Sequence, residues 1–309
     1  MNTQSNAMSE AFESQRAIPG VMAATRPLYW SVRRELWENR SLYIAPLAVA
    51  AVILFGFLIN TIGLPHRLLD LWGLDPAEQR KHVALPYDMA AGLMMLTGMI
   101  VGAFYCLDAL YGERRDRSIL FWKSLPVSDL TAVLSKATIP LVILPAIIFS
   151  VTMATQWIML MLNSAVFLAK GMSVVGLWSQ VAFFQSSLLL LYHLYAVHAL
   201  WHAPLYGWML FVSSWARRAA ILWATLPVIA IAALEKILFN TTHFVGFLGY
   251  RLAGGGEDAM TAPGNMPIDP TTHLTPLRFL GTPGLWMGLL FTGLCLLAAV
   301  RLRRSRGPI

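Results

Sequence analysis

The chain has 309 residues, of which 57% are hydrophobic and only 13% are charged. Soluble proteins are typically about half apolar and about a quarter charged, so this composition excludes an ordinary soluble domain. The net charge is +7, but the Lys and Arg residues lie between apolar runs and form no continuous basic segment. This distribution is typical of side chains that face lipid headgroups, so we expect membrane lipid as a partner and no nucleic acid.

Two elements are expected before the first apolar run. Residues 1–26 are polar with mixed charge and have no apolar core before a small-residue cleavage site, so we interpret them as a disordered cytoplasmic tail and not a signal peptide. Residues 28–41 predict an amphipathic helix in the membrane surface, with Pro27 favourable at its start. A simple anchor and a part in coupling are both open roles for it. Its apolar side holds Tyr29, Val32 and Leu36, and its polar side holds Ser31, Arg34, Glu35 and Glu38.

Six long uncharged windows predict six transmembrane helices. A helix needs about 20 residues to cross about 30 Å of hydrocarbon, and all windows but the fifth reach or approach that length. The fifth is completed if Glu235 and Lys236 lie near the outer interface, where long side chains reach water. We predict an all-α integral membrane protein in which residues 27–309 form one six-span domain. The expected spans cover about 43–63, 89–110, 137–162, 181–213, 219–239 and 282–301.

The fourth window, residues 171–216, is long enough for one crossing or two. With six spans, 16 of the 23 Lys and Arg residues fall on the side of the termini. A second crossing in this window would move Arg217, Arg218 and the arginines of the C-terminal tail to the other side, against the positive-inside tendency. We therefore predict six spans with both termini cytoplasmic, and a fourth span that is long or bent near Pro204.

Several common chemistries have no signature in the sequence. There is no G-x-x-x-x-G-K-[ST] loop, so we expect no ATP site of that type and no bound cofactor in this chain. Asp108 and Glu235 are the acids near the predicted spans and lie at their ends, which disfavours an ion-driven carrier. Cys106 and Cys295 lie in uncharged stretches and are interpreted as buried apolar residues. The pairs Gly98 and Gly102, and Gly284 and Gly288, permit close helix approach within the chain or in a dimer.

The fourth window contains three histidines. His198 and His202 are four residues apart, so on a helix they share a face and a metal site is conceivable. That pattern leaves open a histidine-metal membrane enzyme of the desaturase or hydroxylase type. Helix packing or the lining of a transport pathway is the alternative that we favour. The candidate pathway residues are Gln185, His193 and His198.

The segment Tyr111–Lys136 is basic, amphipathic and too short for a domain. A charged turn leads to an apolar stretch, then to Pro126 and a predicted helix start at Ser128. Aromatic residues anchor interfaces efficiently, so the stretch Ile119 to Trp122 suggests a docking point for a cytoplasmic protein. An amphipathic loop that lies on the membrane is the alternative.

This segment resembles the first inner loop of permease subunits of ABC transporters of the type-2 exporter superfamily. Those loops often read E-R-x-x-G-[ST], an apolar patch, a P-[VI]-S turn and a helix that begins near a lysine. The layout of an interfacial helix, six spans and a long outer segment, Asn240 to Gly281, is also similar. One departure is Arg117, where the family usually has glycine. The counterparts implied for a motor-coupling loop are Glu113, Arg114, Arg117, Ser118, Leu120, Trp122, Lys123 and Pro126.

The resemblance implies a non-enzymatic permease of a bacterial-type inner membrane. Its ATP would be bound by separate cytoplasmic ATPase subunits, and a second permease copy or a paralogue would complete the transporter. The outer segment would form short re-entrant helices. The substrate is not indicated by the residues, and a membrane-embedded assembly or sensor subunit is a further alternative.

Overall fold

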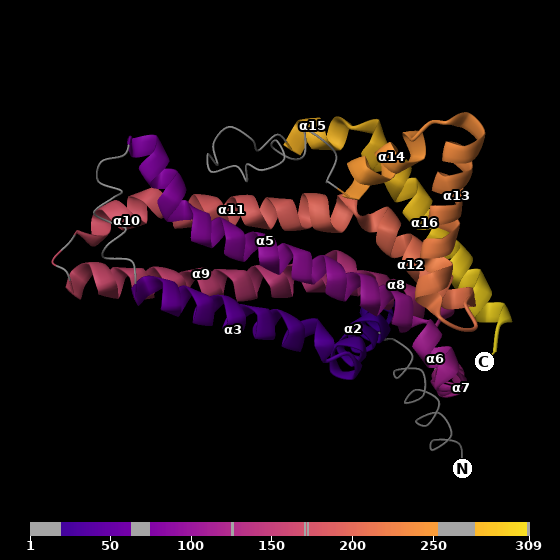
Figure 1. Ribbon diagram of the computed structural model, residues 1–309. Helices are drawn as coiled ribbons and strands as arrows, with labels where there is room; N and C mark the ends of the chain where they lie inside the picture. The colour runs from indigo at the N-terminus through magenta and orange to yellow at the C-terminus, as the bar shows by residue number, and fades with distance from the viewer. Residues whose placement is uncertain are drawn as a thin grey trace, which may run out of the picture.

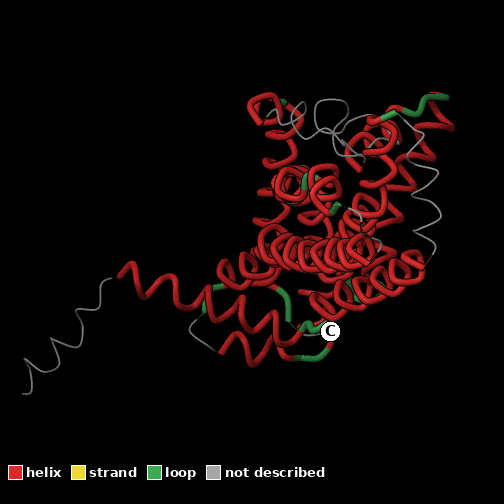
Figure 2. Tube along the Cα trace, turned by 90° about the vertical axis from the view of Figure 1, so that its left-hand side faces the viewer, coloured by secondary structure: helices red, strands yellow, loops and turns green. Residues whose placement is uncertain are grey.

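The computed structural model describes residues 20–62, 75–124, 127–169, 171, 173–252 and 276–307. Every regular element in these ranges is a helix (Figures 1 and 2). Six helical stretches are long and apolar enough to cross a membrane. The predicted all-α fold of a multi-pass membrane protein is therefore confirmed.

The elements follow one another with short connections in the described ranges. They are α2 (Gly20–Glu38), α3 (Ser41–Ile62), α5 (Pro76–Ala109), α6 (Tyr111–Arg115), α7 (Ser118–Ser124), α8 (Asp129–Thr138), the π-helix η1 (Ile139–Ile143), α9 (Leu144–Ala169), α10 (Val174–Val181), α11 (Phe183–His193), the π-helix η2 (Leu194–Trp201), α12 (Ala203–Trp215), α13 (Ala220–Phe239), α14 (His243–Leu252), α15 (Pro276–Gly281) and α16 (Pro283–Ser305).

Helix α2 lies across the ends of the long helices, and its first part projects beyond the bundle (Figure 2). It begins at Gly20, so the final residues of the expected tail are helical and Pro27 lies inside the helix. Residues 1–19 lie outside the described ranges. Its predicted polar side is only partly exposed. Ser31 and Glu35 are buried, and Glu35 is only 1% exposed because Lys136 of α8 neutralises it, whereas Glu38 is exposed. Tyr29, Trp30 and Trp37 are exposed.

The helix of the second span begins before the predicted crossing. Helix α5 begins at Pro76 and includes Asp88, which the sequence analysis had placed outside the span. The expectation treated charged residues as breaks. A helix of 34 residues is about 51 Å long, however, so its charged first turns extend past about 30 Å of hydrocarbon without interrupting the helix.

The fourth window forms one interrupted helical path, as predicted. Ala182 adopts a left-handed backbone conformation (φ 47°) between α10 and α11. A second interruption falls at His202, two residues before Pro204, where the π-helix η2 ends with a hydrogen bond from His202 N to Val197 O. Proline has no N–H and clashes with the preceding turn, which explains the change of direction between α11 and α12 (Figure 1).

The largest core cluster joins α5, α9, η2 and α12 around Met94, Leu144, Leu194 and Tyr206. Gly98 lets α5 approach α9, since an added Cβ would lie 2.9 Å from Ile148. This pair of helices therefore uses its small residues within the chain. Cys106 and Cys295 are free and buried, which confirms their interpretation.

Candidate functional site

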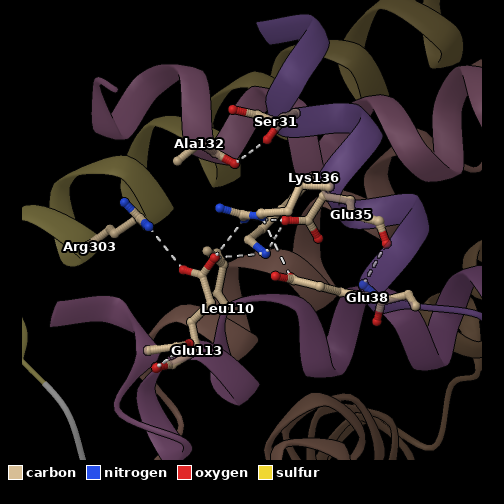
Figure 3. A network of polar contacts seen from close by, with 12 residues as sticks. Ser31, Glu35, Glu38, Leu110, Glu113, Ala132, Lys136 and Arg303 are labelled. Carbon is tan, nitrogen blue, oxygen red and sulfur yellow. Dashed lines mark hydrogen bonds and ion pairs between the residues drawn. The ribbon is translucent and has the colours of Figure 1, made fainter. Parts of the chain in front are cut away.

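A cluster of buried ion pairs lies where α2, α6, α8 and α16 meet (Figure 3). Lys136 is 2% exposed, and its Nζ lies 2.9 Å from Glu35 Oε1 and 3.1 Å from Glu113 Oε1. Arg303 Nη2 lies 2.9 Å from Glu113 Oε2. Four segments that are far apart in the sequence are thus joined by two carboxylates. We call the residues Arg34, Glu35, Glu113, Asp129, Lys136 and Arg303 the charge network.

The remaining members close the charge network at its edges. Arg34 Nη2 donates to Glu113 Oε1 at 3.2 Å, and Arg303 Nη1 donates to Asp129 Oδ1 at 2.8 Å. The Tyr105 hydroxyl donates to Glu35 Oε2 at 2.8 Å. Three cations face three carboxylates, so the cluster is electrically balanced. Both ends of the described chain contribute to it and therefore lie on the same side of the bundle.

The balance determines the ionisation of the residues on α2. Burial by itself would raise the pKa of Glu35, but Lys136 and Arg34 outweigh burial and hold that pKa below its usual value. Burial would likewise lower the pKa of Arg34, but the neighbouring carboxylates, Glu35 first, raise it. Both side chains are therefore charged at neutral pH. A buried ion pair contributes little net stability, but the loss of one partner leaves an uncompensated charge.

Arg114 fixes the start of the loop to the C-terminal end of α12. Its Nη1 donates to Ser214 O at 2.8 Å and to Ala216 O at 3.2 Å. These carbonyls have no partner within the helix, and a cation there also complements the helix dipole. Arg306 Nη1 donates to Trp215 O at 3.0 Å, so the end of α16 joins the same place.

The turn after α6 depends on an unusual backbone conformation. Arg117 has a φ of 59°, in the left-handed region that glycine adopts most easily. The resemblance placed a glycine at this position, and here an arginine makes the turn. The chain then enters α7, and the Ser118 hydroxyl donates to Glu113 O at 3.4 Å.

Helix α7 presents part of its apolar stretch on the surface. Leu120 and Phe121 are 58% and 59% exposed, whereas Ile119 is buried. Trp122 is half-buried because the Arg34 guanidinium lies 3.8 Å from its ring centroid. Lys123 Nζ donates to Arg306 O at 3.3 Å. Of the four residues expected to form a docking point, Leu120 and Phe121 are therefore exposed on the surface.

The structure thus divides the predicted loop residues into groups with different surroundings. Glu113 and Arg114 are buried anchors, and Leu120 belongs to the exposed surface of α7. Pro126 lies outside the described residues. The predicted helix start is confirmed, since Ser128 caps α8 by accepting a hydrogen bond from Thr131 N at 3.1 Å.

Sequence reasoning missed most of the charge network. Glu35 was assigned to the polar side of a surface helix without a partner, and the roles of Asp129 and Arg303 were not foreseen. One signal was available: Glu35, Glu113 and Lys136 each lie on a segment that is otherwise partly apolar. Nothing in the spacing, however, says which carboxylate meets which cation.

The histidines of the fourth span contact backbone carbonyls. His198 Nε2 lies 2.8 Å from Met95 O, and His202 Nε2 lies 3.2 Å from Leu252 O. His193 Nδ1 lies 2.9 Å from Leu189 O in its own helix. Gln185 is exposed on α11 and does not join them. Among the described residues, no group of three or more His, Cys, Asp or Glu side chains is placed to hold a metal ion.

No family model, curated protein or solved structure matches the chain. The chemistry of the residues around α7 is therefore the basis for a functional assignment. A balanced network with all its carboxylates paired is suited to holding segments together and poorly suited to proton transfer.

Proposed function

We propose that the chain is the membrane-spanning permease subunit of an ATP-binding-cassette exporter, driven by a separate cytoplasmic ATPase subunit. The observation that carries the proposal is the contrast within the segment from α6 to α7. Its first part is fixed by buried ion pairs, and its second part presents Leu120 and Phe121 on the surface. Exposed aromatic and aliphatic side chains on a rigid support are what a docking partner requires.

The charge network gives the proposed docking helix a mechanical connection to the bundle. Glu113 begins the segment and contacts Lys136 at the start of the third span and Arg303 at the end of the sixth. A displacement of α7 by a motor would therefore act on both spans. Coupling requires that the motor bind one arrangement of the spans more tightly than the other, and ATP would select between them.

Purification of the full chain from its native membranes tests the proposal. The wild-type chain should retain an ATPase subunit with its own G-x-x-x-x-G-K-[ST] loop, and the purified complex should hydrolyse ATP. The Leu120→Asp/Phe121→Asp double variant should lose that subunit, because both exposed contacts are replaced by charge. Ser305→Asp, which adds charge to an exposed position at the same end of the bundle, should retain it.

Two results would contradict the proposed function. One is a wild-type complex without ATPase activity. The other is equal retention of the ATPase subunit by the double variant and by Ser305→Asp, which would place the docking surface elsewhere.

A further inference from the structure

Another buried cation lies at the opposite end of α16 from the charge network. Arg251, on α14, is only 6% exposed. Its Nη2 donates to Gly284 O at 3.0 Å in the first turn of α16, whereas Arg303 lies in the last turn of the same helix. Figure 1 shows α14 beside the start of α16, away from α6 and α7. This region is separate from the proposed docking helix.

Gly288 leaves the space that the Arg251 guanidinium occupies. A Cβ on Gly288 would lie 1.5 Å from Arg251 Nη2, so only glycine leaves room there. The guanidinium carbon lies 4.2 Å from the centroid of the Trp201 ring, in a cation–π contact. Gly288 had been interpreted as a helix-packing residue, and it does lie against Pro204 of α12. The structure shows that it also accommodates Arg251.

Arg251 has no acidic partner among the described residues, and burial lowers its pKa. Among the described residues its contacts are one carbonyl and one aromatic ring, so its guanidinium faces no anion there. Polar groups beside it are unsatisfied in the described part of the chain. Trp201 Nε1, in a side chain only 1% exposed, and His202 Nδ1 have no hydrogen-bond partner. Buried polar groups in proteins are normally paired, so this combination indicates a missing ligand.

The chemistry of the missing ligand follows from the donors and their position. The planar guanidinium fork matches an oxyanion, and the start of a long helix also favours negative charge. Gly284 lies in the first turn of a helix long and apolar enough to span a membrane, and the ends of such helices are where lipid headgroups are expected. The side chain of Thr282, which precedes that helix, makes no capping hydrogen bond to its first N–H groups.

We propose that Arg251 and Trp201 form a binding site for a phosphate group, supplied by a phospholipid headgroup or by a free phosphate. The phosphate would accept from the free edge of the guanidinium and from the indole N–H, and the Trp201 ring would keep the guanidinium in place. The site does not depend on the proposed motor, because none of its residues belongs to α6 or α7.

Binding to the purified full chain in a neutral detergent tests this site. The probes are dioleoyl phosphatidylglycerol, dioleoylglycerol without the phosphate, and inorganic phosphate, with affinity measured by native mass spectrometry. The wild type should prefer phosphatidylglycerol over dioleoylglycerol. Arg251→Gln should weaken phosphatidylglycerol binding about tenfold or more, the usual effect of a lost charge-assisted hydrogen bond. Arg301→Gln, which removes an exposed arginine from the other end of α16, should bind as the wild type does.

A conservative variant covers the case in which Arg251→Gln fails to fold. Trp201→Phe keeps an aromatic ring under the guanidinium and removes only the N–H, so it should weaken binding several-fold. Binding of inorganic phosphate without preference for phosphatidylglycerol would identify a soluble phosphate as the source. If neither phosphate probe binds better than dioleoylglycerol, or if Arg251→Gln and Arg301→Gln weaken binding equally, the proposal is wrong.

Discussion

A buried arginine lies at each end of α16, and the two have opposite electrostatic surroundings. Arg303 faces Glu113 and Asp129, and the cluster around it is neutral. Arg251 faces an aromatic ring and a carbonyl, with no acid among the described residues. The pKa values of one arginine from each region show the same difference. Carboxylates raise the pKa of Arg34 in the charge network, while burial lowers the pKa of Arg251.

Arg303 therefore neutralises carboxylates of its own fold, whereas Arg251 is available for the proposed phosphate ligand. In the charge network each carboxylate needs a cation, so the pairs hold four helices in one arrangement. At Arg251 the described residues provide the space but no carboxylate as counter-charge. Substitutions at the two ends should therefore have different effects on the free energy of unfolding.

Removal of the central lysine should have the largest effect. Lys136→Met leaves Glu35 and Glu113 buried without their shared cation, so we expect a loss of about 3–5 kcal/mol in unfolding free energy. Thermal unfolding of the purified protein in detergent measures it. Lys236→Met replaces an exposed lysine on α13 and should change stability little. Equal effects of the two substitutions would contradict the role given to the charge network.

A methyl group at position 288 should have the next largest effect. Gly288→Ala places a Cβ against Arg251 and the Pro204 ring, so we expect a loss of about 1–3 kcal/mol from overpacking. Gly293→Ala on the same helix is the matched control, because nothing lies within 4 Å of its added Cβ. That control should be neutral or stabilise the helix by about 0.5–1 kcal/mol. The same thermal assay measures the stability of both variants. Similar shifts would show that Gly288 is not tightly packed against Arg251.

Removal of Arg251, which faces no acid among the described residues, should have a smaller effect in the absence of lipid. Arg251→Met removes a buried charge together with its contacts to Trp201 and Gly284, so these terms largely cancel and we expect a change below about 1 kcal/mol. Addition of phosphatidylglycerol should stabilise the wild type and not the variant, because a ligand stabilises only the state that binds it. A loss as large as that of Lys136→Met, without lipid, would show that Arg251 is a structural residue like those of the charge network.

The left-handed turn before α7 should show the smallest effect. Arg117→Gly removes a backbone strain of about 1–2 kcal/mol but also increases the freedom of the unfolded chain. We expect a net gain of about 0.5 kcal/mol, measured by thermal unfolding. Arg117→Val keeps the strain and adds a β-branched side chain, so it should be less stable than the wild type. If Arg117→Gly is less stable than the wild type, the arginine side chain has a structural role that outweighs its backbone strain.

Local pattern and composition were sufficient for much of this protein. The apolar windows predicted six spans because a helix in lipid must satisfy its own backbone and remain uncharged over about 20 residues. Pro204 predicted the interruption of the fourth span, and Ser128 predicted a helix start. Each of these depends on a few neighbouring residues. The helix of the second span begins before its apolar window, because a charge ends such a window without ending a helix.

The two buried-charge regions were decided only by the tertiary structure. Glu35 and Lys136 are 101 residues apart, and Arg303 is 190 residues from Glu113. No local pattern records which distant charges become neighbours, so a carboxylate on an amphipathic helix looks solvent-facing until its cation is in place. The glycine at 288 likewise resembled any small residue in a membrane helix. Its purpose became apparent once α14 placed Arg251 against it, because ion pairing and steric fit depend on atoms brought together by folding.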